Sequence, residues 1–416
     1  MSMSEKEMHE MSVAPVACSA ADWVKRGAAS DAWAATKSGI LENDLSNALY
    51  PQYVERASGA HLWDVDGNRY LDFVMGYGPV VLGHAHPEVD AAVCAQLAKG
   101  SCMSPMWSPR QVELAELLVE VIPGAELVYL MKTGSDATSA SVRLARIHTG
   151  RSKVAKWGYN GWHDWTAPRQ EGVPPSTLAE TLRFHYNDLA SLERLFAGHP
   201  NEIACVIMMP YELEEERPGF LVDVKALANR NGAVFIMDEM RSGFRMALGG
   251  AQEYFGVTAD ISTFSKAMSN GYPISAVVGK RELLTCLGRT HMSSTFFANA
   301  PEMAAAITTI LLLRDSDVIP RLWELGTVLQ DGLREIVRAS QLPAEVVGYP
   351  VSPFLQFHSA DDPAVLRVKY AFYAATIGGG VLLHPNHQWF LSGSHTRAEI
   401  DRALNVCGSA AKAAAG

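Results

Sequence analysis

A chain of 416 residues exceeds one simple hydrophobic core, so it predicts one large and one smaller domain. Apolar residues make up 48% and charged residues 19%, which is typical of a globular enzyme. The net charge of −10 argues against a nucleic-acid partner, and no apolar run reaches membrane-spanning length. The six cysteines are scattered without CxxC spacing, which indicates reduced thiols in the cytoplasm and no metal site.

The N-terminal part of the chain begins with a polar, methionine-rich segment, 1–20, that we expect to be a mobile arm. A helix is expected over 21–36 and a loop over 38–51. Alternating apolar positions in 60–73 flank the turn residues Asp66-Gly67-Asn68. That arrangement predicts a β-hairpin.

Two short loops follow the predicted hairpin. Gly76-Tyr77-Gly78-Pro79 is a tight loop that carries one aromatic ring, Tyr77. The next loop contains His84 and His86, which could be read as metal ligands. A structural role is the stronger interpretation, because Pro87 is expected to begin a helix there.

A strand over 128–131 leads into Thr133-Gly134-Ser135-Asp136-Ala137 and then a helix over 138–148. The backbone N–H groups at such a turn can bind an anion, although many β-α turns contain Gly and Ser without doing so. A further strand is expected over 153–157, followed by Tyr159. Tyr159 could stack on a ligand or only cap the edge of the sheet.

The stretch 233–279 carries the strongest chemical signal. An apolar run, 233–237, reads as a buried strand that ends in Asp238, and a second run, 261–264, precedes Lys266. Ligands of open α/β sheets bind beyond the carboxyl ends of the strands. A buried lysine has a lowered pKa and can form a Schiff base, while a carboxylate can hold a cationic ring nitrogen. Taken alone, such a pair is more often a surface salt bridge.

The motifs around these two residues are similar to those of the class III (omega) aminotransferases of fold type I. The pattern D-E-x-x-x-G-F-R stands at 238–245, G-A-Q-x-Y-F-G-V-x-x-D at 250–260, and Lys266 precedes the G-x-P at 271–273. Within the family, the chain most resembles glutamate-1-semialdehyde aminomutase. The resemblance extends from about Tyr50 to the C-terminal helix.

The resemblance implies pyridoxal phosphate as cofactor, with Lys266 as the Schiff-base lysine and Asp238 against the ring nitrogen. It also implies Gly134 and Ser135 as phosphate donors, and Tyr159 and Met240 on the two faces of the ring. Thr295, in the segment that precedes a helix over 300–313, matches the threonine that reaches the phosphate of the other subunit. The family relationship therefore implies a homodimer with shared active sites.

The implied fold is an α/β architecture with a large domain built on a mostly parallel seven-stranded sheet, plus a small α+β domain. We expect residues 1–70 to belong to the small domain, 71–310 to form the large cofactor-binding domain, and 311–416 to complete the small domain.

The expected substrates are a small-molecule amino-acid donor and a carbonyl acceptor. The aminomutase's early arginine has no clear counterpart in 41–49, and its C-terminal glutamate loop is replaced by His384, His387 and Trp389. With Tyr77, these residues suit a cyclic, hydroxylated acceptor. A zinc site of His384, His387 and His395 is the less favoured reading.

The alternative activity is a PLP-dependent isomerase, either a 4,5-aminomutase or an epimerase, that would use the same lysine. The sequence does not name the acceptor.

Overall fold

The computed structural model describes residues 18–36, 50–359 and 361–415. Most of the expected arm at 1–20 and of the expected loop at 38–51 lies outside these ranges, as does the segment 41–49 in which no substrate arginine was found. The α-helices are α2 (Ala20–Ser30), α3 (Ala32–Ala35), α5 (Pro87–Leu97), α6 (Pro109–Val121), α7 (Gly134–Thr149), α8 (Pro175–Leu178), α9 (Leu189–Gly198), α10 (Phe220–Arg230), α11 (Ala251–Phe255), α12 (Arg281–Leu284), α13 (Ala300–Arg314), α14 (Val318–Ser340), α15 (Pro363–Gly378) and α16 (Arg397–Ala415). Short 3-10 helices are η1 (Met75–Tyr77), η2 (Lys266–Ser269), η3 (Thr285–Arg289) and η4 (Thr295–Ala298).

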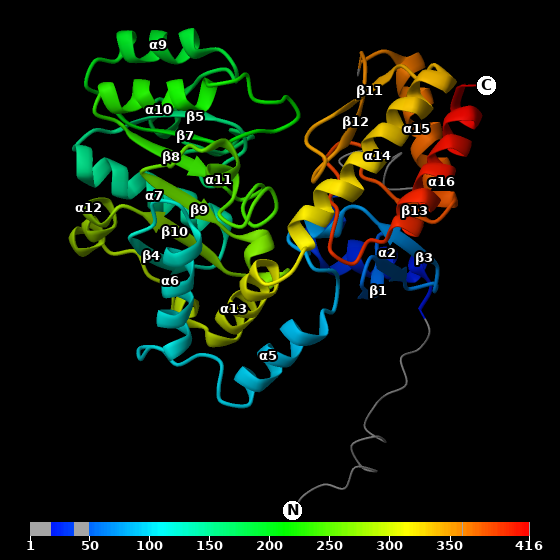
Figure 1. Cartoon of the computed structure of the whole chain (residues 1–416), viewed down its shortest axis with the longest axis horizontal. Coiled ribbons are helices and arrows are strands. Elements are labelled where there is room, and N and C mark those ends of the chain that lie inside the picture. Colours follow the sequence, from blue (N-terminus) through cyan, green and yellow to red (C-terminus); the bar gives the residue numbers. More distant parts are fainter. Residues whose placement is uncertain (1–17, 37–49, 360, 416) are drawn as a thin grey trace, which may run out of the picture.

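A seven-stranded sheet organises the middle of the chain (Figure 1). Its spatial order is β4 (Leu127–Met131), β10 (Ser275–Gly279), β9 (Ile261–Phe264), β8 (Val234–Asp238), β7 (Ile203–Met208), β5 (Lys153–Trp157) and β6 (Thr181–Arg183). β10 is antiparallel to both of its neighbours, whereas the pairs from β9 to β6 are parallel. The prediction of a mostly parallel seven-stranded sheet is therefore confirmed.

Both faces of this sheet are buried, which explains why its central strands read as continuous apolar runs. Along β8, Val234 and Ile236 lie on the face of the sheet that packs against α7, whereas Phe235 and Met237 belong to the larger core on the opposite face. Asp238 continues the Val234 and Ile236 face at the carboxyl end of the strand. The period of two thus places the carboxylate on the α7 side.

A second sheet joins the two ends of the chain. β1 (Val54–Ser58), β2 (His61–Asp64) and β3 (Arg69–Asp72) form antiparallel pairs, and β13 (Val381–Leu382) pairs in parallel with β3. The predicted hairpin is thereby confirmed. In Figure 1 the blue N-terminal strands lie beside the orange-to-red C-terminal elements, which include the short pair β11 (Ala344–Val347) and β12 (Phe354–Phe357).

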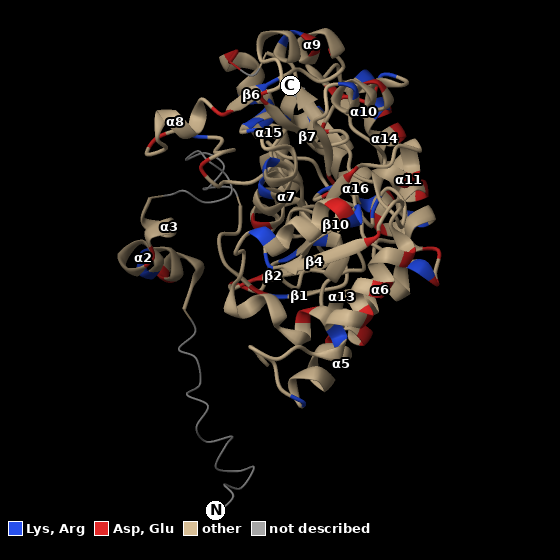
Figure 2. Ribbon diagram, turned by 90° about the vertical axis from the view of Figure 1, so that its left-hand side faces the viewer, with Lys and Arg blue, Asp and Glu red and all other residues tan. Residues whose placement is uncertain are grey.

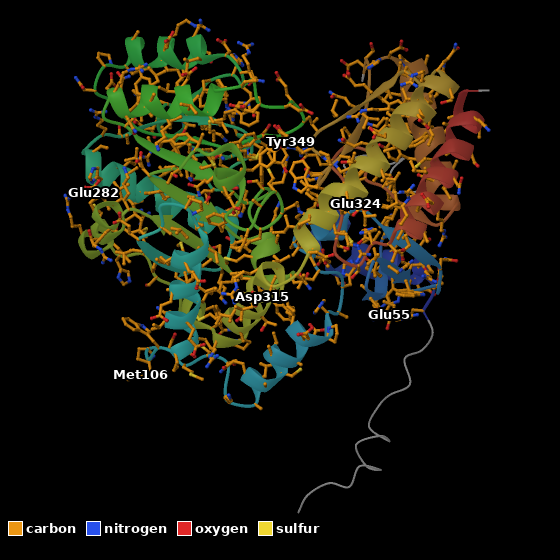
Figure 3. All side chains as sticks on the ribbon, viewed as in Figure 1. Glu55, Met106, Glu282, Asp315, Glu324 and Tyr349 are labelled. Atoms are coloured by element: carbon orange, nitrogen blue, oxygen red, sulfur yellow. The ribbon has the colours of Figure 1, made fainter. Side chains whose placement is uncertain are left out.

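An aromatic cluster connects the large sheet region to the C-terminal elements. Tyr254 stacks on Trp323 of α14 at 5.0 Å between ring centroids, and Tyr211 meets Tyr349 edge-on at 4.8 Å. Figure 3 shows Tyr349 where the two parts of the molecule meet. Such pairs add about 0.5–1.5 kcal/mol each beyond the area that they bury.

One expectation for an individual element needs correction. The helix expected over 21–36 is interrupted at Asp31, whose extended backbone ends α2 and whose side chain accepts the Ala34 N–H at 2.9 Å to begin α3.

The acidic run 214–216 lies in a largely exposed loop, and two of its carboxylates are hydrogen-bonded. Glu214 accepts from Asn187 at 2.7 Å and Glu216 accepts the Leu221 N–H at 3.1 Å.

Basic and acidic residues are interspersed over the ribbon in Figure 2. None of the helices in the described part of the chain is long and apolar enough to cross a bilayer.

Candidate active site

The carboxyl ends of β8 and β9 bring Asp238 and Lys266 to one edge of the sheet. Asp238 pairs with Thr263 across the two strands, and Lys266 follows three residues later. Asp238 is almost completely buried, and it accepts hydrogen bonds from Asn160 Nδ2 at 2.8 Å and from the Met240 N–H at 3.1 Å. Burial raises the pKa of this carboxyl group, and the two hydrogen bonds oppose that rise.

Lys266 begins the 3-10 helix η2 in a left-handed conformation, with φ of 46°. Strain of this kind in a residue other than glycine is often stored at functional sites. Burial, and then the positive charge of Arg241, lower the pKa of the Lys266 amine to about 8. The amine can therefore exchange a proton near neutral pH, as chemistry at an amine requires.

The N-terminus of α7 lies beside this pair. The helix begins at Gly134, earlier than the predicted 138, because Thr133 and Asp136 form a reciprocal capping box. Gly134 and Ser135 are the first two helical residues, so their N–H groups project from the positive end of the helix. A Cβ atom on Gly134 would lie 2.8 Å from Met240 Sδ, so a larger residue there would require the Met240 side chain to shift.

The segment after β5 crosses in front of the same helix end. Tyr159 is exposed over 54% of its surface, whereas its neighbour Asn160 is buried and holds Asp238. Gly161 has φ of 109°, and a Cβ there would lie 2.5 Å from Ser135 Oγ. Asn160 Oδ1 is buried without a hydrogen-bond partner among the described residues. Asn160 is thus a site residue that the sequence analysis did not include.

Tyr77, His384 and His387 converge although some 307 residues separate the first two. Tyr77 Oη lies 3.2 Å from His384 Nε2, and the Tyr77 ring meets that of His387 edge-on at 4.8 Å. His384 Nδ1 accepts the Asn386 N–H at 3.0 Å, so its other nitrogen carries the proton when the ring is neutral. Burial and the charge of Arg241 lower the pKa of His387 to about 3, which keeps that ring neutral.

The loop that carries Tyr77 is strained. Residues 75–78 all have positive φ, at 47°, 64°, 68° and 96°. Asp72 accepts the N–H groups of Val74 and Met75, and the buried Arg245 donates to the carbonyl of Gly78 at 2.8 Å. These contacts hold the Tyr77 ring against the two histidines despite the strain.

Trp389 and His395 occupy different environments from those expected. Trp389 is fully buried in the core, and its indole N–H donates to the carbonyl of His384 at 2.8 Å. It therefore has no exposed surface and no remaining donor for a substrate, and it supports the His384 loop from behind. His395 Nε2 lies 3.1 Å from the carbonyl of Asp72, and its Nδ1 accepts the Ser392 N–H at 3.0 Å.

Both nitrogens of His395 are thus engaged with the backbone, which argues against the zinc reading. Across the part of the chain that the structure describes, no group of three or more His, Cys, Asp or Glu is placed to hold a metal ion. His84 Nε2 lies 2.9 Å from Asp72 Oδ2, which agrees with the structural interpretation of that histidine.

Thr295 lies on the exposed 3-10 helix η4. Its carbonyl accepts from Ser104 Oγ at 2.9 Å, which joins η4 to the segment before α6. Phe296, Met106 and Trp107 lie on these two segments with 58%, 71% and 75% of their surfaces exposed. Thr295 therefore belongs to a surface that is rich in exposed apolar side chains.

Arg241 is a further residue of the candidate site. Its side chain is 10% exposed, and its Nη1 donates to Gln388 Oε1 at 2.8 Å and to Glu212 Oε1 at 3.3 Å. Its charge contributes to lowering the pKa values of Lys266, Asp238 and His387. The motif D-E-x-x-x-G-F-R contains Arg241 at a variable position, so only the fold shows its importance.

The arrangement fits pyridoxal phosphate. Asp238 is a buried carboxylate whose two hydrogen-bond donors are neutral, so a cationic ring nitrogen would supply the missing counter-charge. The α7 N-terminus offers N–H groups to a phosphate, and Lys266 offers an amine of lowered pKa. Met240 lies against Gly134, at the N-terminus of α7.

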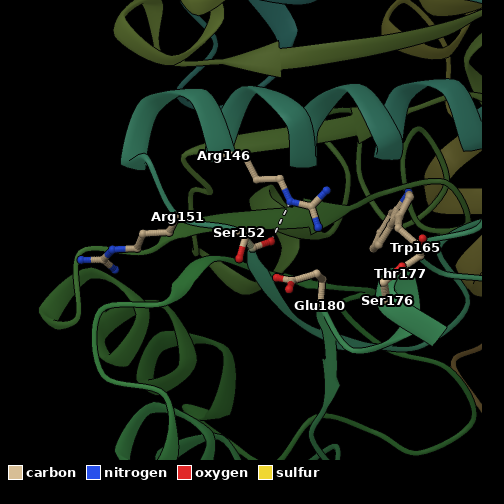
Figure 4. A pocket seen from close by; sticks show the side chains of 7 residues that line it. All are labelled: Arg146, Arg151, Ser152, Trp165, Ser176, Thr177 and Glu180. Atoms are coloured by element: carbon tan, nitrogen blue, oxygen red, sulfur yellow. Dashed lines mark hydrogen bonds between the residues drawn. The ribbon is translucent and has the colours of Figure 1, made fainter. Parts of the chain in front are cut away.

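A hollow of about 350 Å³ lies elsewhere on the surface (Figure 4). It is lined by Arg146, Arg151, Ser152, Trp165, Ser176, Thr177 and Glu180. Arg146 Nε donates to the carbonyl of Ser152 at 2.7 Å. None of the predicted site residues lines this hollow, so the chemistry of the sheet edge does not extend into it.

Comparison with known proteins gives a consistent result. The family model "Aminotransferase class-III" matches residues 44–388. The 3-aminobutyryl-CoA aminotransferase of Cloacimonas acidaminovorans is 38% identical over 359 residues, which cover 84% of this chain and 86% of that protein. A glutamate-1-semialdehyde 2,1-aminomutase of Chloroflexus aggregans is 34% identical over 394 residues, with coverage of 86% and 89%.

Among solved structures, the FumI protein of Sphingopyxis sp. MTA144, in its PLP internal-aldimine form, superposes with a TM-score of 0.87. The two chains are 31% identical, and the match covers 94% of this chain and 95% of the other.

Proposed function

Because this chain belongs to the class III aminotransferases, which use pyridoxal phosphate, we propose that it transfers an amino group from an amino-acid donor to a cyclic, hydroxylated carbonyl acceptor. The observation that carries the acceptor class is the convergence of Tyr77, His384 and His387. All three carry polar atoms that can exchange hydrogen bonds with hydroxyl groups, and the lowered pKa of His387 keeps its ring neutral. Trp389 is left out of this set because it is buried.

The proposed roles follow from position. Lys266 Nζ would hold the cofactor aldehyde, and its amine of lowered pKa would carry the proton that moves during amino transfer. Asp238 keeps a proton on the ring nitrogen, and Asn160 orients that carboxylate. Gly134 and Ser135 hold the phosphate, while Tyr159 and Met240 contact the ring. The bound cofactor supplies an electron sink for the charge that develops when the substrate loses its proton.

A homodimer completes the proposal. The exposed apolar side chains on η4 and before α6 favour burial against a second copy, in which the partner subunit's Thr295 would reach the phosphate. We also propose two domains, a small domain formed by residues 1–70 and 311–416 and a large domain formed by residues 71–310. The pairing of β3 with β13 supports this division because it joins the two ends of the chain. All six cysteines are free thiols, which supports a cytoplasmic location.

An isomerase remains the second candidate, because a glutamate-1-semialdehyde 2,1-aminomutase is 34% identical to this chain. The two activities differ in stoichiometry. An aminotransferase incubated with donor alone releases a keto acid and is left in its amine form, whereas an isomerase returns a rearranged substrate and no keto acid.

The test first converts the enzyme to its amine form with an amino acid and measures the keto acid released. Cyclic hydroxylated ketones and glutamate semialdehyde are then offered separately, and recovery of the original absorbance is followed. We expect the cyclic acceptors to discharge the amine form and Lys266→Ala to show no turnover. Discharge by glutamate semialdehyde alone would contradict the proposed acceptor class.

A further inference from the structure

Arg241 lies in the turn that follows β8, three residues beyond Asp238, with nine-tenths of its side chain buried. One edge of its guanidinium is occupied, since Nη1 donates to both Gln388 and Glu212. Gln388 is itself buried and donates to the backbone carbonyl of Glu212, which fixes this arrangement. The head group therefore has a defined orientation.

The other edge of the Arg241 guanidinium is open. Nε is buried without a hydrogen-bond partner, and none of the hydrogen bonds found among the described residues uses Nη2. Nε and Nη2 are the parallel N–H pair that binds a carboxylate through two hydrogen bonds. A buried, charged donor without an acceptor is costly, so this edge is suited to an anionic ligand.

Arg241 lies near the candidate active site, three residues beyond Asp238 in the same turn. Its charge acts on Lys266, Asp238 and His387. Its ion-pair partner among the described residues, Glu212, has a side chain that is 42% exposed, so water screens much of that attraction. Glu212 therefore offsets only part of the Arg241 charge.

We propose that Arg241 binds the carboxylate of the amino-acid donor through Nε and Nη2. This inference rests on the proposed aminotransferase function and names the donor as a carboxylate-bearing amine rather than a simple amine. In this proposal the carboxylate of the donor and the hydroxyl groups of the acceptor contact different residues. Two chemically different substrates can in this way use one site in turn.

The experiment compares wild type, Arg241→Gln and Arg241→Lys as holoenzymes. Paired donors, 2-aminobutyrate and 1-propylamine, measure the contribution of the carboxylate to kcat/KM of the first half-reaction. Calorimetric titration with propionate, which has no amino group, measures carboxylate binding without turnover. Arg110→Gln, which removes an exposed ion pair with Glu113, is the matched control.

We expect Arg241→Gln to lower kcat/KM for 2-aminobutyrate about 100-fold and propionate affinity at least about 10-fold, since the substitution removes two hydrogen bonds between oppositely charged groups. The value for 1-propylamine should change less than about threefold. Arg241→Lys keeps the charge without the paired N–H groups and should recover only part of the loss. The control should match wild type.

Equal losses for the amino acid and the amine would overturn the proposal. An unchanged propionate affinity together with a weakened or spectrally altered cofactor would also overturn it, because Arg241 would then serve an anionic oxygen of the cofactor. If wild type reacts with no donor but Arg241→Gln still loses propionate binding, the carboxylate site stands and the proposed function fails.

Discussion

The carboxylate of Asp238 depends on its immediate neighbours. It is buried, and it is oriented by Asn160 Nδ2 and the Met240 N–H rather than by a positively charged side chain. An amide does not titrate, so the orientation of Asp238 should not change with the protonation of its neighbour.

We predict that Asp238→Asn slows the half-reaction on the order of a thousandfold, because the ring nitrogen would lose its proton and the developing charge would be less stabilised. The measurement is the single-turnover rate with a saturating amino acid. Cofactor content and thermal stability should be determined in parallel. Near-normal rates in a fully loaded variant would show that Asp238 does not hold the ring nitrogen.

At the scale of elements, Glu239 connects β8 to the helix that follows. This buried carboxyl group accepts the N–H groups of Ala251 and Gln252 at 2.9 Å each, at the start of α11, and the Ser242 hydroxyl. It thereby fixes the turn that carries Met240 and Arg241. Burial raises the pKa of Glu239 to about 7.

The raised pKa predicts a pH-dependent stability. Between about pH 4.5 and pH 7 the folded protein holds a proton on Glu239 that the unfolded chain has lost. The contribution of this carboxyl group to the free energy of unfolding is therefore fully present below pH 4.5 and is lost as the pH rises through 7. The slope for one group is at most about 1.4 kcal/mol per pH unit. We expect the Tm of wild type to fall relative to the Tm of Glu239→Gln as the pH rises from 5 to 8.

Thermal unfolding of both proteins across this range is the measurement. Glu253→Gln, on the partly exposed side of α11, is a suitable control. A Tm difference that does not vary with pH would mean that Glu239 is ionised throughout this range.

At the scale of the whole molecule, the candidate site is assembled from distant parts of the chain. Tyr77 comes from the N-terminal third, Asp238 and Lys266 from the large sheet, and His384 and His387 from the C-terminal loop. The aromatic cluster around Tyr349 and the buried Arg245, which donates to the carbonyls of Gly78 and Leu391, hold these parts together. Thr295, in contrast, is exposed in the single subunit.

The proposed dimer predicts complementation between two defective variants. Lys266→Ala and Thr295→Ala chains, mixed after mild dissociation, should restore about one native site in four, because one site of each mixed dimer would combine Lys266 with the partner's Thr295. The measurement is activity after mixing compared with the sum of the separate variants, with sedimentation to establish the oligomer. Failure to gain activity in verified mixed dimers would show that the site is not shared.

The sequence by itself determined the elements whose signals are local. Apolar runs of five and four residues predicted β8 and β9, the Asp66-Gly67-Asn68 turn predicted the hairpin, and the motifs around Asp238 and Lys266 predicted the family and its cofactor. These features depend on the period of side chains along a strand and on turn geometry, both of which neighbouring residues fix. The match of residues 44–388 to the class III aminotransferase family confirms the resemblance.

Only the tertiary structure decided which side chains face the site. Trp389 looked like a substrate contact, but its burial and its hydrogen bond to His384 depend on packing that no local pattern encodes. Arg241 stood at a variable motif position, and its open Nε–Nη2 edge became visible only because Gln388 and Glu212 occupy the other edge from distant segments. The direction of a side chain in a loop depends on contacts with residues that are distant in the sequence. The spacing of residues along the chain does not predict such contacts.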